Sequence, residues 1–294
     1  MNGLVCQVSA LNGAGNKKIA LVTGGNKGIG FEICRILGSP QNNILVILGA
    51  RDTNRGNEAC NKLKQQGIDA IFRELEVSDV NSVKNCAAWI QDNFGHLDIL
   101  VNNAGIFYKT GPLSKEVARH TMDVNFYGTL YCCQYFVPLL REGGRVVNMS
   151  SRMALFARLS PTLFKKLTKQ DLTIPELCEL MESFIRSVEN GRVKEDGWFR
   201  HSYGVSKVGV VCLTRILARD EKRQDILINC CCPGFVRTDM TAPNAEKSPE
   251  EGADTPVWLA LLPKGGPTGK FFGERKELDI RTNFPAPRLQ LSKL

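Results

Sequence analysis

Tyr203 and Lys207 lie four residues apart in the segment RHSYGVSKVGV, which spans residues 200–210 and begins a predicted helix. Side chains four residues apart are neighbours on one helix face. Two interpretations are open: a pair on a solvated surface, or a phenol that donates a proton beside a cation that stabilises its ionised form. The spacing alone favours the surface pair, so the rest of the chain must decide.

Short apolar segments alternate with stretches of helical periodicity along most of the chain. Strands that are apolar on both faces are typical of a parallel sheet covered by helices on each side. The alternation therefore predicts an α/β protein, a doubly wound parallel sheet (Rossmann fold), in one domain over residues 17–280. The ends, 1–16 and 281–294, are expected to be loosely ordered. The predicted strands are 18–24, 43–50, 70–77, 97–105, 144–151, 226–234 and 269–274.

Composition and charge argue against several classes of protein. The chain has 294 residues and a formal net charge of +8, but Lys and Arg are spread among Asp and Glu, so no nucleic-acid partner is expected. The apolar runs are too short to span a bilayer, and the N-terminus lacks the pattern of a secretory signal, so no membrane association is expected. Eleven cysteines without C-x-x-C pairs, and three histidines away from them, indicate free thiols and no metal site.

The first predicted strand runs directly into the glycine-rich segment TGGNKGIG. Glycines in such a turn let a pyrophosphate approach the backbone N–H groups at the start of the next helix, where the helix dipole favours an anion. A mere tight turn is the alternative, but the position after the first strand favours dinucleotide binding. The predicted contacts in this segment are Gly24, Asn26, Lys27, Gly28, Ile29 and Gly30.

The end of the second predicted strand indicates which dinucleotide is bound. Ala50 occupies the position where an acidic residue would hold the ribose 2′-hydroxyl of NAD, and Arg51 and Arg55 follow it. Together with Lys27, these cations suit a 2′-phosphate and favour NADP(H) as the cofactor. The alternative is a set of solvated surface charges, which the neighbouring acidic residue Asp52 favours.

Five segments resemble, in order, the motifs of the short-chain dehydrogenase/reductase family: TGGNKGIG, NNAG at 102–105, NMSS at 148–151, YGVSK at 203–207 and PGFVRT at 233–238. The resemblance covers about residues 17–280. It is closer still to the monomeric carbonyl reductases of that family, through ARDTNRG, CCPGFVRTDM and SPEEGADTPVWLALLP.

The resemblance implies a role for each member of a catalytic group. Tyr203 would be the general acid that protonates the carbonyl oxygen, and Lys207 would bind the nicotinamide ribose and hold a positive charge beside the phenol. Ser151 would polarise the substrate oxygen, and Asn125 would hold a proton-relay water with Lys207. Taken singly, each has a structural alternative, such as a helix cap or a turn.

The resemblance also assigns contacts around the cofactor and the substrate. Arg152 departs from the family, which usually has an apolar residue after the serine; it is expected to lie beside the reacting carbonyl and favour anionic substrates, or to point to solvent. The further cofactor contacts are Glu76, Val77, Asn103, Pro233, Gly234, Val236, Arg237 and Thr238. The substrate pocket comprises Ser151, Arg152, Met153, Tyr203, Phe235 and Met240.

A helical insertion over about residues 160–198 precedes the tyrosine. Thr173 and Glu176 form a predicted capping box, and Gly191 a helix stop. Between them an apolar stripe recurs at helical spacing. In the monomeric carbonyl reductases a comparable insertion covers a surface that other family members use to assemble, so the resemblance implies a monomer, although such a stripe also suits a new interface. The stripe consists of Leu177, Leu180, Met181, Phe184, Ile185 and Val188.

These observations predict NADPH-dependent reduction of aldehydes, ketones or quinones, with a small-molecule carbonyl substrate. Alcohol oxidation with the same residues and a non-catalytic NADP(H)-binding regulator are the alternatives. The chain ends in Ser292, Lys293 and Leu294, a tripeptide that an import receptor reads as a peroxisomal signal. Peroxisomal localisation is therefore expected, with a coincidental tripeptide on a cytoplasmic enzyme as the alternative.

Overall fold

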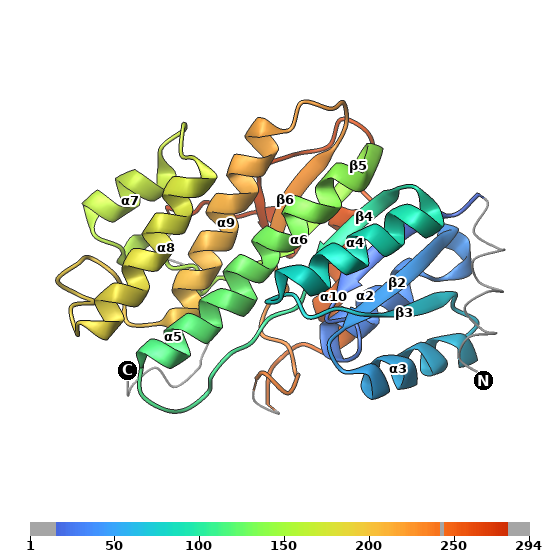
Figure 1. The fold of residues 1–294 in the computed structure, drawn as a ribbon, viewed down its shortest axis with the longest axis horizontal. Coiled ribbons are helices and arrows are strands. Elements are labelled where there is room, and N and C mark those ends of the chain that lie inside the picture. The colour runs from blue at the N-terminus through green and yellow to red at the C-terminus, as the bar shows by residue number, and fades with distance from the viewer. Residues whose placement is uncertain (1–15, 242–243, 282–294) are drawn as a thin grey trace.

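The computed structural model describes residues 16–241 and 244–281, and it contains one eight-stranded sheet with the strand order β3-β2-β1-β4-β5-β6-β7-β8 (Figure 1). Every neighbouring pair from β3 to β7 is parallel. The predicted doubly wound parallel sheet is confirmed. The strands are β1 Lys18–Thr23, β2 Ile44–Ala50, β3 Ala70–Glu74, β4 Leu97–Asn102, β5 Leu140–Met149, β6 Leu227–Cys232, β7 Phe271–Gly273 and β8 Lys276–Glu277.

Several strand predictions need correction. β4 ends at residue 102 instead of 105, and β5 spans residues 140–149 instead of 144–151. β3 ends at Glu74 instead of continuing to residue 77, so Glu76 and Val77 lie in the loop that follows. β8, which the sequence analysis did not predict, pairs antiparallel with β7. The turn between them places Glu274 and Arg275 at φ 53° and 58°. Two consecutive left-handed residues are typical of a type I′ hairpin turn, but the turn lacks the Asn-Gly or Asp-Gly pair that signals one in a sequence.

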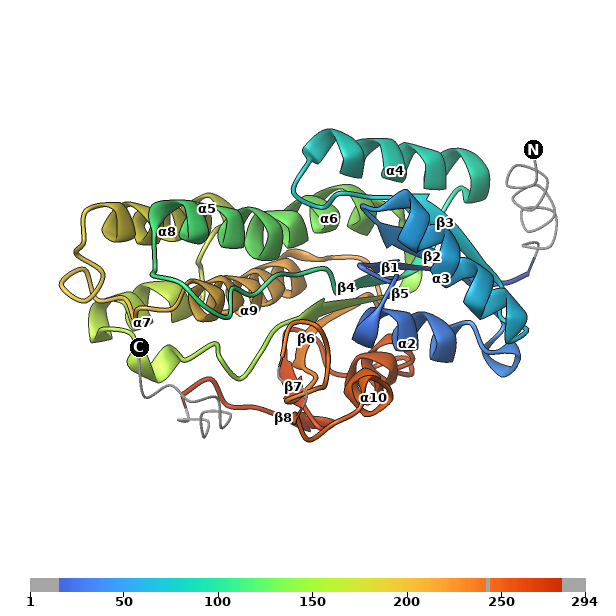
Figure 2. The ribbon, with the colours of Figure 1, turned by 90° about the horizontal axis from the view of Figure 1, so that it is seen from below.

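Helices cover both faces of the sheet (Figure 2). On one face α2 (Gly28–Leu37), α3 (Thr53–Gln65) and α10 (Pro249–Ala260) enclose one apolar core. On the other face α4 (Val80–Phe94), α6 (Gly128–Phe136) and α9 (Ser202–Asp220) pack on the same strands. Because β1, β2, β4 and β6 are buried along almost their whole length, the sheet is a rigid support for the loops at its edges.

The segment between β5 and α9 contains α7 (Pro161–Thr168) and α8 (Ile174–Glu189). Thr173 and Glu176 form the predicted capping box at the start of α8, and Gly191, at φ 68°, follows its end. The predicted stripe on α8 faces inward, against α9 and α5 (Lys115–Met122). Phe184 is fully buried there and makes an edge contact with Trp198, with ring centroids 5.6 Å apart.

Within the described residues, no helix has the length and apolar character needed to cross a membrane, and no cluster of side chains could hold a metal ion. The ten cysteines within the described ranges are all free thiols. The predicted terminal segments and the tripeptide Ser292 to Leu294 lie outside the described residues.

Candidate active site

A cavity of ≈ 550 Å³ lies at the carboxyl ends of the central strands, where β1, β4, β5 and β6 meet the loops that follow them. In a doubly wound sheet this edge is where ligands bind. Tyr203 and Lys207, from the first turns of α9, line the cavity together with the glycine-rich turn after β1. The structure therefore places the predicted catalytic pair beside the predicted cofactor turn and not on a solvated surface.

Tyr203 lines the cavity and is half-buried. Burial, the largest cause, and the nearby Cys232 thiol raise the pKa of Tyr203 above its ordinary value, while a hydrogen bond with Ser151 lowers it. The phenol is protonated at neutral pH, as a proton donor must be, and the raised pKa extends this form to higher pH. The Oγ of Ser151 also accepts a hydrogen bond from the Met153 amide at 3.1 Å, which fixes the serine at the end of β5.

Lys207 is 4 % exposed, and its ammonium group donates to the Met149 carbonyl oxygen at 2.7 Å. Burial lowers the pKa of Lys207 to about 8, because a charge is poorly solvated there. The ammonium nitrogen lies 5.5 Å from the centroid of the Tyr203 ring. The spacing of one helical turn thus places the Lys207 cation close to the Tyr203 phenol. Burial makes the charged form of Lys207 less favourable than it would be on the surface.

Asn125 lies in a π-helical turn, Asp123–Tyr127, between α5 and α6. Its amide exchanges two hydrogen bonds with the Ile106 backbone, at 2.8 and 3.0 Å, and donates to Ser206 Oγ at 3.1 Å. A Cβ atom added to Gly105 would lie 3.2 Å from Asn125 Oδ1 and 3.7 Å from Lys207 Nζ. Asn125 and Lys207 therefore both lie next to the backbone of Gly105 and Ile106, and the π-helical turn orients Asn125 toward that backbone.

The glycine-rich turn has the shape that a dinucleotide requires. Gly24 and Gly28 have φ values of 64° and 55°, which other residues rarely adopt. A Cβ atom at Gly30 would lie 2.3 Å from the Gly24 carbonyl oxygen, so the helix can approach the turn only with glycine there. Lys27, the N-cap of α2, makes no side-chain cap bond. The N–H groups of the first turn of α2 are thus available to an anion, and the site fits a pyrophosphate.

The predicted phosphate-binding cations are only partly gathered at the cavity. Lys27 and Arg51 line it, although Lys27 donates to Asp239 at 2.6 Å and Arg51 lies 3.7 Å from Glu76. Arg55 does not line the cavity; its guanidinium pairs with Asp52 at 2.8 Å, and its charge acts on Asp239 at the cavity. Asp52 caps α3, so the arginine one turn along that helix reaches the capping carboxylate.

The remaining predicted cofactor contacts fall into two groups. Gly234 and Val236 lie next to the cavity without lining it; Val236 instead packs against Gly252 of α10. The other residues line the cavity directly, and they are Asn26, Ile29, Glu76, Val77, Asn103, Pro233, Arg237 and Thr238.

The predicted substrate residues are less closely grouped. Met240 and Tyr203 line the cavity, whereas Met153 is buried with 5 % of its surface exposed. Phe235 does not line the cavity; its carbonyl oxygen accepts a hydrogen bond from the Lys247 amide. Arg152 turns its guanidinium toward Glu274, with 3.8 Å between the charged groups. This carboxylate, which also binds Lys247, partly neutralises the cation that was expected to attract anionic substrates.

Several residues at the site had escaped the sequence analysis. Phe107, in the loop after β4, lines the cavity and contacts the Tyr203 ring edge-on at 5.2 Å. His201 is the N-cap of α9 and stacks on Phe107. Asp239 pairs with Lys27 across the cavity mouth. A histidine directly before a helix that carries a predicted acid was a usable signal for His201, whereas an isolated Phe107 or Asp239 gives none.

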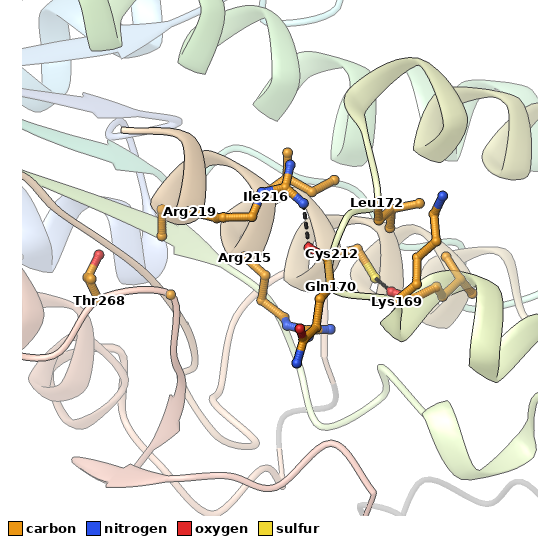
Figure 3. Close-up of a pocket in the computed structure, with 11 residues that line it drawn as sticks. Lys169, Gln170, Leu172, Cys212, Arg215, Ile216, Arg219 and Thr268 are labelled. Carbon is orange, nitrogen blue, oxygen red and sulfur yellow. Dashed lines mark hydrogen bonds between the residues drawn. The ribbon is translucent and has the colours of Figure 1, made fainter. Parts of the chain in front are cut away.

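A second hollow, of ≈ 440 Å³, lies at the far end of α9 beside the α7–α8 loop (Figure 3). Its thiol, Cys212, donates to the Leu167 carbonyl oxygen at 3.3 Å, and burial raises the pKa of Cys212 to about 12. Arg219 binds Asp220 and the Gln170 carbonyl oxygen there. In this hollow the thiol is protonated and Arg219 is paired, whereas the predicted acid and its cation lie together in the cavity at Tyr203.

The fold and the cavity agree with comparisons against known proteins. The family model for short chain dehydrogenases matches residues 18–161 and 185–249, so the chain belongs to this family. The unmatched residues 162–184 fall within the segment of α7 and α8.

Among curated relatives, carbonyl reductase (NADPH) 1 of Rattus norvegicus is 44% identical over 276 residues, covering 89% of this chain and 98% of the relative. Its counterpart from Homo sapiens is 43% identical over 272 residues, covering 88% and 96%. Among solved structures, salutaridine reductase from Papaver somniferum superposes with a TM-score of 0.79 at 31% identity, covering 87% of this chain and 99% of that one. The chain is therefore similar to reductases over nearly its full described length.

Proposed function

We propose that this protein is an NADPH-dependent carbonyl reductase that converts aldehydes, ketones or quinones to alcohols or hydroquinones. The observation that carries the proposal is the juxtaposition of Tyr203 and Lys207 with the glycine-rich turn in one cavity, with Ser151 hydrogen-bonded to Tyr203. The similarity to the NADPH-named carbonyl reductases, at 43–44% identity, supports the choice of cofactor and reaction.

The protein's own residues handle the proton and the charge. Tyr203, which is protonated at neutral pH, donates its proton to the carbonyl oxygen of the substrate. Ser151 and the Lys207 cation stabilise the negative charge that develops on the substrate oxygen and then on the phenolate. Bound NADPH supplies the hydride that the carbonyl carbon receives. The first turn of α2 would hold its pyrophosphate, and Lys27 and Arg51 would hold its 2′-phosphate.

The substitution Tyr203→Phe tests the assignment, because it removes the transferable proton and keeps the ring that packs on Phe107. We expect kcat to fall by about 10²-fold or more, with the dissociation constant for NADPH, measured by fluorescence titration, unchanged. Tyr108→Phe is the matched control, because Tyr108 is exposed and bonds His120 instead of facing the cavity. Retention of more than about a tenth of kcat by Tyr203→Phe would overturn the mechanism.

The substrate class is the next quantity to determine. Apolar and aromatic side chains surround the reacting position, including Phe107, Ile106 and Met240. A panel of quinones, diketones, aldehydes and ketosteroids, followed by NADPH oxidation, would rank them. Comparison of anionic with neutral quinones in Arg152→Ala tests whether that guanidinium selects anions. Equal losses for both quinones would exclude the selection.

We further propose a monomer. α8 buries its apolar stripe against α5 and α9 within the same chain, which covers a helical surface that would otherwise be open to a second copy. Sedimentation or light scattering should give a mass near 32.5 kDa. A mass twice that value would refute the proposal.

We propose peroxisomal localisation on the basis of the terminal Ser292-Lys293-Leu294. A fluorescent protein fused to the N-terminus leaves the C-terminus free for an import receptor. We expect punctate fluorescence from the full chain and diffuse fluorescence after deletion of Leu294. Diffuse fluorescence from both would favour the cytoplasm.

A further inference from the structure

His201 occupies an unusual position for a histidine, because it is the N-cap of the helix that carries Tyr203. The amide of Gly204 donates to its Nδ1 at 3.0 Å. A neutral imidazole accepts at one nitrogen and donates at the other, so this bond places the proton on Nε2. Aspartate, asparagine or serine would make the same cap without changing charge in this pH range.

The imidazole also belongs to a cluster of three rings at the cavity. It stacks on Phe107, with centroids 5.9 Å apart and planes 10° apart, and it meets the Tyr203 ring edge-on at 6.3 Å. Phe107 meets the same tyrosine at 5.2 Å. The position of His201 therefore sets both the backbone from which the phenol projects and one wall against which the phenol rests.

We infer that His201 is a positioning residue for the reaction: its neutral imidazole holds the first turn of α9, and with it Tyr203, and protonation of the imidazole releases that turn. An imidazolium has N–H groups at both nitrogens and cannot accept the Gly204 hydrogen bond. Its charge would also lie at the positive end of the helix dipole. This inference rests on the proposed role of Tyr203.

The surroundings favour the neutral form. Burial is the main cause that lowers the pKa of His201 below 6.5, and the charge of Arg158 lowers it further. Arg158 comes from the short helix Phe156–Arg158, Phe107 from the loop after β4, and Tyr203 from α9 itself. Within the described ranges, the one ion pair of a histidine joins His96 to Asp98, so no carboxylate pairs with His201.

The sign of the pH effect follows from this pKa. Below pH 6.5 the unfolded or released segment binds the proton more readily than the capped one, so acid favours the released turn. The hydrogen bond from Gly204 to His201 is fully formed above pH 6.5 and is lost as the pH falls through the lowered pKa of His201.

The test compares variants that separate the cap from the ring. His201→Asn retains an N-cap that does not titrate, and His201→Phe retains the stacked ring without an acceptor. We expect the ratio of kcat/KM, wild type to His201→Asn, to be constant above pH about 6.5 and to fall as the pH is lowered from about 6.5 to about 4.5. His201→Phe should have a lower kcat at both pH values and show no additional loss in acid. His120→Asn, at an exposed histidine, should follow the wild-type profile.

Amide hydrogen exchange over residues 202–207 provides a readout that does not depend on turnover. Wild type should lose protection in acid after correction for the intrinsic rate, and His201→Asn should not. A constant kcat/KM ratio, or equal protection in both proteins, overturns the inference about His201. A wild type without any NADPH-dependent reduction would refute the proposed function instead, and its exchange profile would still decide whether His201 is a pH-sensitive cap.

Discussion

The buried ammonium group of Lys207 gives a quantitative prediction for the alkaline side of the pH profile. Its pKa is lowered to about 8 by burial, whereas the pKa of Tyr203 is raised above its ordinary value by burial. If the reaction needs both the Lys207 charge and the Tyr203 proton, activity is lost first as the pH rises through the pKa of the lysine. At pH about 9, one unit above that pKa, about one molecule in eleven retains the charge, so activity should fall about tenfold.

The appropriate measurement is kcat/KM for NADPH, which reports the pKa values of the free protein. Initial rates between pH about 6.5 and about 10 should describe a single descending limb with a midpoint near 8. Lys207→Arg, which keeps its charge throughout this range, should have a lower plateau and no such limb. Lys109→Met removes an exposed cation that bonds the Thr241 carbonyl oxygen, and it should leave the midpoint unchanged. A wild-type profile that stays flat to pH about 9.5 would refute the reasoning.

Two further substitutions test the cofactor site and the helical insertion. Arg51→Asp should shift the ratio of kcat/KM for NADPH and NADH toward NADH by about tenfold or more, because it removes a phosphate partner and adds a repelling charge. The control Arg192→Asp should leave this ratio unchanged. An unchanged ratio in Arg51→Asp would make Arg51 a surface charge only. Phe184→Ala should lower the free energy of unfolding in urea by about 3–5 kcal/mol because it opens a cavity against Trp198. The exposed control Glu179→Ala should change it by less than about 0.5 kcal/mol, and a comparably small effect of Phe184→Ala would contradict the packing argument.

Features that depend on local pattern could be predicted from the sequence alone. Apolar runs of strand length located the strands β1 to β7, because a strand buried on both faces must be apolar throughout. Thr173 and Glu176 located the start of α8, because a capping box is made within one turn. Gly24 and Gly30 marked the turn after β1, where the backbone leaves no room for a side chain.

The tertiary structure alone decided how charged and aromatic groups meet across the fold. Arg55 was expected at the cofactor and pairs with Asp52 in the structure. Lys27 pairs with Asp239, which lies in the distant loop after β6. The sequence placed Lys207 one turn from Tyr203, but only packing shows that the ammonium group is buried and that its pKa is lowered. The contact of His201 with Phe107 likewise joins two segments that the sequence does not connect. Local pattern fixes which element a residue occupies, whereas the partners and pKa of a side chain depend on neighbours that the folded sheet brings together from remote parts of the chain.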